Sequence, residues 1–251
     1  MPHALFLSPH LDDVAFSCAG VLLRLIAAGW STTVVTCFTA SVPHPQGFAL
    51  STQLDKGLPA TVDYLALRRA EDQAFAATVG AEIHHLPFAE APHRGYQSAA
   101  DLFHGIHEDD YIHLDLMAAL GALLTAYRPT FIFAPQGLGQ HVDHLQVMRA
   151  LTSIHVPCPI AWYRDLPYAI RHPHAATSIT EPEHAVSLPA SILAQKIVAC
   201  AAYPTQVPFQ FGSAAAMGTQ LTTFHQAEAM RHGLTAGAAE CFRSRTPLPL
   251  A

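Results

Sequence analysis

Apolar residues along the chain fall into short unbroken runs that alternate with longer amphipathic stretches. Strands are predicted over 4–8, 32–38, 82–87 and 130–135, and near 160–163. Helices are predicted over 13–29, 63–79, 113–127, 142–152 and 189–202. The runs assigned to strands are apolar throughout, as expected for strands buried on both faces of a sheet. The pattern therefore predicts an α/β fold, in which an open, mostly parallel sheet carries helices on both faces.

Two stretches lack a clear period. Residues 41–60 carry several prolines and glycines and are predicted to form a long loop. Residues 88–112 are irregular and rich in histidine, and we expect them to form a flexible cover. Beyond residue 165 only the helix over 189–202 is predicted, so the C-terminal part of the fold is largely left open.

Composition narrows the class of protein. With 251 residues, 51% apolar and 13% charged, the chain is expected to form a single globular domain over 1–251. A net charge of −6, with only 13 Lys and Arg and no basic run, argues against a nucleic-acid or anionic-membrane partner. No signal peptide and no long uncharged apolar stretch is found, which predicts no stable membrane insertion. The apolar content is also compatible with a homo-oligomer.

The cysteines bear on the compartment. Five cysteines are scattered singly, without a C-x-x-C pair. Such a pattern is typical of reduced thiols, so we expect a cytoplasmic protein.

Two clusters of metal-competent side chains follow predicted strands. They consist of His10, Asp12 and Asp13 after the strand at 4–8, and of His141, Asp143 and His144 after the strand at 130–135. Active sites of open parallel sheets gather beyond the C-terminal ends of the strands. If the two strands are neighbours, the clusters meet. Singly, each Asp is explained as a helix cap and each His as a surface residue. Together, they favour a metal site.

Histidine and carboxylate ligands suit Zn²⁺ and also Fe²⁺. A catalytic site of this kind takes three protein ligands, which His10, Asp13 and one histidine of the second cluster would supply. Asp12 would then serve as the base for a water molecule. The remaining histidine would stabilise the oxyanion or protonate the leaving group. Asp143 would hold the other nitrogen of that histidine and keep it charged.

Several segments resemble one family. "SPHLDD" is similar to the H-x-D-D-E signature of the PIG-L/LmbE-like metal-dependent deacetylases, and "GQHVDH" resembles their H-x-D-H motif. "LRRAEDQAFAATVG", "FAPQGLGQHVDHLQV", "WYRDLPYA" and "YPTQ" give further support. The resemblance implies a Rossmann-like fold, a zinc or iron cofactor, and removal of an acetyl group from an N-acetylglucosamine-type amide. It assigns the metal to His10, Asp13 and His144, the general base to Asp12, and the electrostatic or acid role to His141, tuned by Asp143.

One position departs from the family pattern. Val14 stands where the signature usually has Glu. The residue lies outside the set assigned to metal or chemistry, so the implied mechanism is retained. The substitution puts in question the contact that the glutamate would make, either with residues that support the site or with the substrate.

Substrate contacts are predicted at Arg68, Arg94, Tyr163 and Asp165, with Tyr168 as a further sugar-facing aromatic. Arg68 alternatively pairs with Glu71 or Asp72 on its own helix. Arg94 is alternatively an ordinary loop arginine, and the residues around 163–168 are alternatively core and turn residues.

Three other functions are weighed against an N-deacetylase that acts on a small-molecule N-acetylated sugar conjugate. The same metal site would serve a metallohydrolase for longer acyl amides or esters. A catalytically silent sugar- or metal-binding homologue has no need of Asp12, although Val14 favours it slightly. A dinucleotide-dependent oxidoreductase is excluded, because "SPHLDD" is no glycine-rich cradle and its carboxylates would repel a pyrophosphate.

Overall fold

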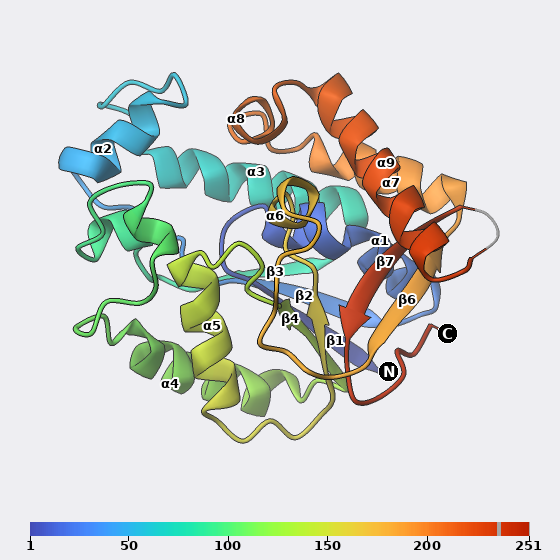
Figure 1. Cartoon of the computed structure of the whole chain (residues 1–251). Helices are drawn as coiled ribbons and strands as arrows, with labels where there is room; N and C mark the ends of the chain where they lie inside the picture. Colours follow the sequence, from blue (N-terminus) through green and yellow to red (C-terminus); the bar gives the residue numbers. More distant parts are fainter. Residues whose placement is uncertain (235–236, 251) are drawn as a thin grey trace.

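The computed structural model describes residues 1–234 and 237–250 of the chain. Its strands form one sheet in the order β3-β2-β1-β4-β5-β7-β6 (Figure 1). The strands are β1 (His3–Ser8), β2 (Ser31–Thr36), β3 (Glu82–His85), β4 (Phe131–Pro135), β5 (Ile160–Tyr163), β6 (Glu183–Leu188) and β7 (Ala238–Arg243). The five strands from β1 to β5 pair in parallel, while β7 pairs antiparallel with both β5 and β6. The predicted open, mostly parallel sheet is confirmed.

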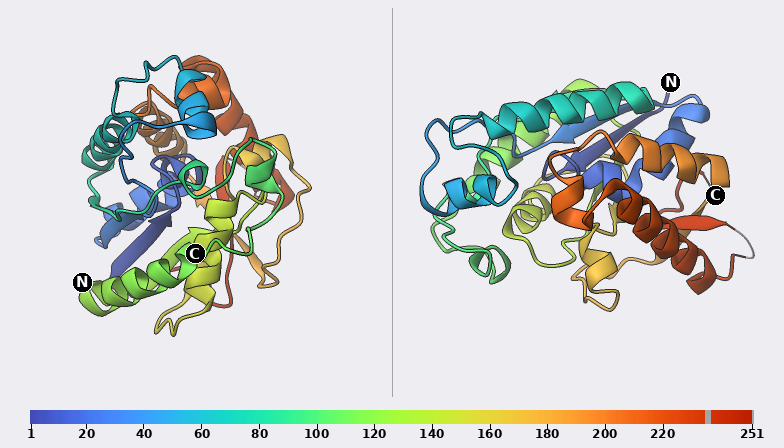
Figure 2. Two further views of the ribbon diagram at one scale, coloured as in Figure 1. Left: turned by 90° about the vertical axis from the view of Figure 1, so that its left-hand side faces the viewer. Right: turned by 90° about the horizontal axis from the view of Figure 1, so that it is seen from above.

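Helices cover both faces of this sheet, as predicted (Figures 1 and 2). They are α1 (Asp13–Ala27), α2 (Gly47–Leu54), α3 (Tyr64–Val79), α4 (Ile112–Tyr127), α5 (Val142–Thr152), α6 (Tyr168–Arg171), α7 (Ala190–Cys200), α8 (Val207–Phe211) and α9 (Ala214–Arg231). Helices α4 and α5 lie on one face, and α1, α3, α7 and α9 lie on the other. Two short 3₁₀ turns, η1 (Ala91–His93) and η2 (Asp101–Phe103), interrupt the irregular segment before α4.

The core divides into two layers because successive side chains of a strand point to opposite faces. In β1, Phe6 packs in the layer under α1, where its ring stacks on that of Phe133 at 4.4 Å. Its neighbours Leu5 and Leu7 pack in the layer under α4 and α5. The side chains of Leu5, Phe6 and Leu7 are all fully buried. An unbroken apolar run is thus what a strand with helices on both sides requires.

Local signals fix the ends of α3. The Asp63 side chain accepts a hydrogen bond from the backbone N–H of Ala66 at 2.9 Å and so caps the helix start. Gly80 ends the helix at φ 80°, a conformation that glycine adopts without the strain of a side chain. The predicted span of 63–79 is confirmed to within a residue.

Helix α1 holds a kink that its sequence does not announce. Cys18 has non-helical backbone angles, and the N–H groups of Gly20 and Val21 donate to the carboxylate of Glu240 on β7. Lys196 of α7 lies 2.6 Å from the same carboxylate and balances its charge. The carboxylate thus caps a second helical start within α1, and ties the helix to β7, the strand next to the edge strand β6.

Three expectations need correction or refinement. Residues 41–60 are not simply a loop, since α2 forms within them. The C-terminal part adds β6, β7, α8 and α9, none of which the hydrophobic pattern indicated. Residues 88–112 contain η1 and η2 and are otherwise irregular, as expected.

All five cysteines carry free thiols, of which only Cys158 is partly exposed. Among residues 1–234 and 237–250, every helix is too short or too polar to cross a membrane.

Candidate active site

The two His/Asp clusters meet at the C-terminal ends of β1 and β4. These strands are neighbours in the sheet and run parallel, with Ala4 opposite Phe131. The first cluster lies in the turn from β1 into α1, and the second in the turn from β4 into α5. The predicted meeting of the clusters is confirmed, and the question becomes what each side chain contacts.

Asp13 lies between two histidines. Its Oδ2 accepts the backbone N–H of His10 at 2.7 Å and lies 3.5 Å from His10 Nδ1 and 3.3 Å from His144 Nε2. Atoms that bind one zinc ion tetrahedrally at about 2.0–2.1 Å are separated by about 3.4 Å, so these spacings match a metal site. His144 Nε2 is buried and has no hydrogen-bond partner in the described part of the chain, as a nitrogen reserved for a metal would. The residues present therefore fit a divalent metal ion.

Carboxylates hold the far sides of both histidines. His10 Nε2 lies 2.8 Å from Asp143 Oδ2, and His144 Nδ1 lies 2.6 Å from Asp165 Oδ1. Such contacts fix the tautomer and orient each ring so that its other nitrogen faces the metal position. Burial alone would lower the pKa of His10, but Asp13 and Asp143 outweigh it and raise the pKa to about 10.

The carboxylate of Asp143 thus reaches a different histidine from the expected one. We expected it to hold His141, but His141 Nδ1 accepts the backbone N–H of Asp143 at 3.2 Å and caps α5. With Nδ1 accepting, a neutral His141 ring carries its proton on Nε2. Burial lowers the pKa of His141 to about 3, and His10 adds to the shift. A neutral hydrogen-bond donor fits this environment better than the charged ring we expected.

His141 also stands close enough to the other two histidines to belong to an alternative ligand set. One ring nitrogen from each of His10, His141 and His144 lies within 4.8 Å of the others. The set with Asp13 is the tighter one, and it leaves His141 free as a donor.

Asp12 occupies the cap position of α1 without acting as a cap. Its side chain makes no capping hydrogen bond, which removes the ordinary explanation for an Asp at this place. It is buried and lines a cavity that opens over the two clusters. Its Oδ1 lies 3.3 Å from Arg68 Nη2. Burial raises the pKa of Asp12 to about 6, although the Arg68 guanidinium opposes the shift. A carboxylate in this state suits proton transfer near neutral pH.

Arg68 lies in the cavity wall and is held by carboxylates. Besides Asp12, it donates from Nη1 to Glu90 Oε1 at 2.6 Å. The alternative pairing with Glu71 or Asp72 is not what the structure shows. Glu71 accepts from Thr205, and Asp72 accepts from Thr36 and Tyr203.

Three of the predicted substrate contacts do not line this cavity. Tyr163 is fully buried, and its hydroxyl donates to the Leu7 carbonyl at 2.9 Å. Asp165 is fully buried against His144, and its Oδ2 accepts the N–H of Leu138. Arg94 is bound to two carboxylates, Asp110 and Asp143. Each side chain is directed to an internal partner that the sequence alone did not identify.

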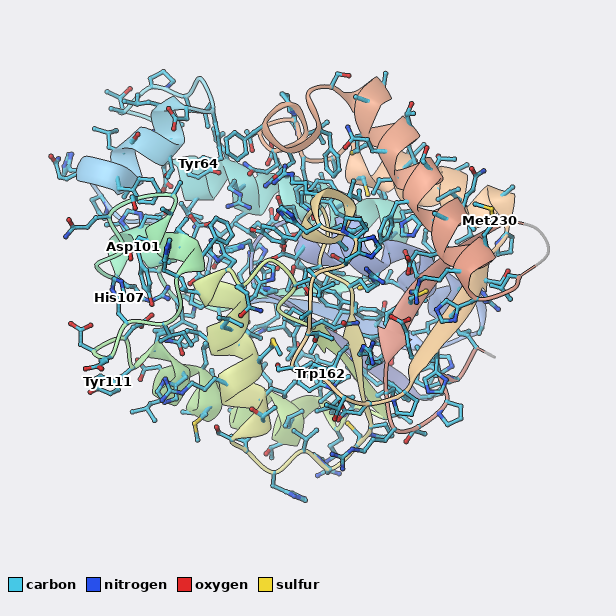
Figure 3. All side chains as sticks on the ribbon, viewed as in Figure 1. Tyr64, Asp101, His107, Tyr111, Trp162 and Met230 are labelled. Atoms are coloured by element: carbon cyan, nitrogen blue, oxygen red, sulfur yellow. The ribbon has the colours of Figure 1, made fainter. Side chains whose placement is uncertain are left out.

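A cavity of about 300 Å³ opens over the cluster. Its walls come from α2, α3, α6, α8 and the segment 88–112. Tyr168 lines it, as considered from the sequence, and packs on Gly139 so closely that a Cβ there would lie 2.6 Å from the ring. Most of the other lining residues were missed by sequence reasoning, among them Phe48, Lys56, Gln206 and Phe209. Lys56 lies over the rings of Phe209 and Tyr64, at 4.6 and 5.2 Å from their centroids. Figure 3 labels Tyr64 at the start of α3.

Comparison with known proteins agrees with this architecture. The family model described as PIG-L, GlcNAc-PI de-N-acetylase, matches residues 5–155, which is more than half of the chain and includes both clusters. The chain belongs to this family. The PIG-L resemblance expected from "SPHLDD" and "GQHVDH" is therefore confirmed.

Two curated relatives of this PIG-L protein are 2'-N-acetylparomamine deacetylases. The one from Streptomyces fradiae is 35% identical over 66% of this chain, and the match spans only 57% of that protein. The one from Niallia circulans is 30% identical over 67% of this chain and 68% of its own length. A solved structure of the zinc-inhibited form of teicoplanin deacetylase shares 21% identity with a TM-score of 0.78, over 96% of this chain and 97% of its own. At that identity the likeness shows the shared fold alone.

Val14 departs from the PIG-L signature at a position turned away from the cavity. The side chain is 1% exposed and packs in the core layer under α1. Only its backbone N–H, which donates to Ser8 Oγ at 3.2 Å, bears on the turn that carries the cluster. The described ligand and cavity residues are present without a glutamate here.

Proposed function

We propose that this protein is a divalent-metal-dependent N-deacetylase that hydrolyses the acetamido group of a small N-acetylated amino-sugar conjugate. The observation that carries the proposal is Asp12, a buried carboxylate that caps no helix and lines a cavity directly beside a ligand set fit for a metal. The PIG-L family and the activities of the two curated relatives support the reaction type.

His10, Asp13 and His144 would hold the metal ion, whether zinc or iron. When bound, it supplies Lewis acidity, which polarises a carbonyl group and makes a nearby water molecule more acidic. Asp12 removes a proton from that water as it attacks the amide carbon. His141 donates its Nε2–H to the developing oxyanion. The protonated Asp12 then gives its proton to the leaving nitrogen, so that water and amide become acetate and a free amine.

The cavity suits a sugar. Its volume lies at the lower end of the usual ~300–1,000 Å³ for small-molecule sites. Aromatic faces of Tyr64, Phe103 and Tyr168 line it, and such faces pack against sugar C–H surfaces. Arg68 supplies donors for sugar hydroxyl groups, whereas the Gln206 amide donates to Tyr64 and Thr205. A cytoplasmic location and a homo-oligomeric state stay predictions from the sequence.

The test separates metal binding from proton transfer. In Asp12→Asn, we expect about one metal per chain to remain while acetate release from N-acetylglucosaminides and 2'-N-acetylparomamine falls by about 100- to 10,000-fold, since a general base is removed. In Asp13→Asn, both the metal and the activity should be lost. Elemental analysis and an acetate assay on the same samples give both numbers.

Asp115→Asn, on the exposed face of α4, serves as the control and should change neither number. Two results would refute the proposal: an Asp12→Asn protein as active as wild type, or wild type that binds no metal. If wild type binds metal but releases acetate from none of the sugars, the site would instead serve the hydrolysis of another bond or the binding of a ligand without catalysis.

A further inference from the structure

We propose that Arg94 and Asp110, both in the irregular segment 88–112, are positioning residues for the metal centre and act through Asp143 on His10. The inference rests on the metal site of the proposed function and adds residues that do not touch the substrate. It follows from a chain of contacts between alternating positive and negative side chains, which runs from His10 through Asp143 and Arg94 to Asp110 in the segment 88–112.

The chain of contacts begins at His10. Asp143 Oδ2 lies 2.8 Å from His10 Nε2 and also accepts the backbone N–H of Ala91 at 3.1 Å. Arg94 Nη2 lies 2.8 Å from the other oxygen, Asp143 Oδ1, as an ion pair. Asp143 is fully buried, so without the guanidinium its charge would lose its main compensation.

Asp110 fixes the guanidinium in turn. Arg94 donates to both oxygens of Asp110, from Nε at 3.2 Å and from Nη2 at 2.9 Å, in the two-point geometry that only arginine offers. A third donor, Nη1, is satisfied by the Ala89 carbonyl at 2.7 Å. The guanidinium also lies 4.8 Å from the centroid of the Phe38 ring. Arg94 thus has one position available, and that position aligns Asp143.

Asp110 is itself anchored to the fold. The Tyr96 hydroxyl donates to Asp110 Oδ2 at 3.0 Å, and Gln146 of α5 donates to the Asp110 carbonyl at 2.9 Å. Farther out, His107 Nε2 lies 2.8 Å from Asp101 Oδ1, and Figure 3 labels both at the outer edge of the molecule. The segment 88–112 is therefore more than a cover, since Arg94 near its start and Asp110 near its end support Asp143 and, through it, His10.

The consequence is a change in metal binding with no direct change at the substrate. Outer partners of metal-bound histidines typically contribute 10- to 100-fold in affinity, and here we expect about tenfold because the effect passes through Asp143. Arg94→Lys keeps the charge but loses the two-point contact. Asp110→Asn keeps the size but loses the charge that holds Arg94. Both variants should weaken Zn²⁺ and Co²⁺ binding and alter the visible spectrum of the Co²⁺-loaded protein.

The chain offers a matched control on α9. Glu228 is bound by Arg231 in the same way, from Nε at 3.3 Å and from Nη2 at 2.7 Å, and is 6% exposed, as Asp110 is. Glu228→Gln should lower the melting temperature about as much as Asp110→Asn does. It should leave the Zn²⁺ dissociation constant unchanged. A general loss of stability is thereby separated from an effect on the site.

The experiment applies four assays to wild type and to the three variants. They measure the melting temperature of the metal-free protein, the Zn²⁺ dissociation constant by chelator competition, the Co²⁺ spectrum, and KM and kcat for acetate release. For Arg94→Lys and Asp110→Asn we expect tenfold weaker Zn²⁺ binding, a lower kcat at limiting metal and an unchanged KM.

Unchanged Zn²⁺ affinity in both variants, or equal weakening in Glu228→Gln, would overturn the inference. A raised KM with normal metal affinity would return Arg94 to substrate binding. If wild type binds Zn²⁺ but releases no acetate, the proposed function fails while the affinity comparison still decides the role of Arg94.

Discussion

Asp143 and Asp165 show that the role of a buried carboxylate depends on which histidine it contacts. Asp143 is two residues from His141 in sequence, yet its carboxylate contacts His10, which follows the neighbouring strand β1. Asp165, considered for substrate, contacts His144. The motif spacing placed the right residue types at one sheet edge. Which carboxylate holds which histidine depends on strand pairing, and this is not readable from the spacing.

Tyr163 offers a test at a single hydroxyl. Its O–H donates to the Leu7 carbonyl inside the core and is remote from the cavity lining. Tyr163→Phe should therefore leave kcat and KM unchanged and lower the free energy of unfolding by about 1 kcal/mol, the usual contribution of one such hydrogen bond. Urea unfolding and steady-state kinetics check both numbers. A raised KM would mean that the hydroxyl contacts substrate after all.

At the scale of elements, most of the predicted strands are apolar runs, and β3 (EIHH) is the exception. Strands β6 (EHAVSL) and β7 (AAECFR) were missed because each mixes charged and small residues. Their charges are satisfied by distant partners, since Glu240 of β7 meets Lys196 of α7 and Glu183 of β6 meets Arg231 of α9. Helix α9 has mostly small and polar residues and shows little apolar period. Long-range ion pairs replace the hydrophobic pattern in this part of the fold.

Glu183 gives this C-terminal unit a distinct pH dependence. Burial alone would raise the pKa of Glu183, but Arg231 and Arg164 outweigh it and hold the pKa below its usual 4.5. The folded-state pKa is thus lower than the unfolded value. The stabilisation is present above pH 4.5 and is lost as the pH falls through the folded pKa. Glu183→Gln should therefore be less stable than wild type at pH 7, and the difference should shrink below pH 4.5.

Chemical unfolding of both proteins between pH 3 and pH 7 measures this difference directly. Glu82→Gln is the control: β3 is the edge strand opposite β6, and the Glu82 carboxylate accepts from the Thr33 hydroxyl of the neighbouring β2 and pairs with no arginine among the described residues. A gap for Glu183→Gln that is constant with pH would remove the ion pairs as its cause.

On the scale of the whole molecule, the cavity is built from segments far apart in sequence. Helices α2 and α8 both lie at the top of Figure 1, and both contribute cavity walls. Lys56, which follows α2, lies over the Phe209 ring of α8. Phe103 of η2 covers His141 edge-on, with ring centroids 5.3 Å apart. The proposed ligand set was readable from two motifs. The walls were not, because they depend on how α2, α8 and residues 88–112 fold back over the sheet.

Phe209 should affect binding rather than chemistry. It lines the cavity, is 54% exposed and lies on the α8 wall, apart from the ligand cluster. Phe209→Ala should raise KM about fivefold, equal to about 1 kcal/mol, and leave kcat unchanged, because an apolar face for the substrate is lost. Met230→Ala on α9, an exposed apolar residue outside the cavity lining, is the control (Figure 3). A fall in kcat with constant KM would contradict the assignment.

The division of the cavity along the chain has a consequence for how this protein can change. The ligand set and Asp12 lie between residues 10 and 144, inside the stretch matched by the family model. Tyr168 and Phe209, which line the cavity, come after that stretch. Among these later residues, Asp165 contacts His144 through its carboxylate and Tyr168 packs its ring edge-on against the same histidine. Mutations in α8 should therefore change which molecule is admitted while the residues of the proposed hydrolysis stay unchanged. One fold can thus acquire new substrates without reinventing its reaction.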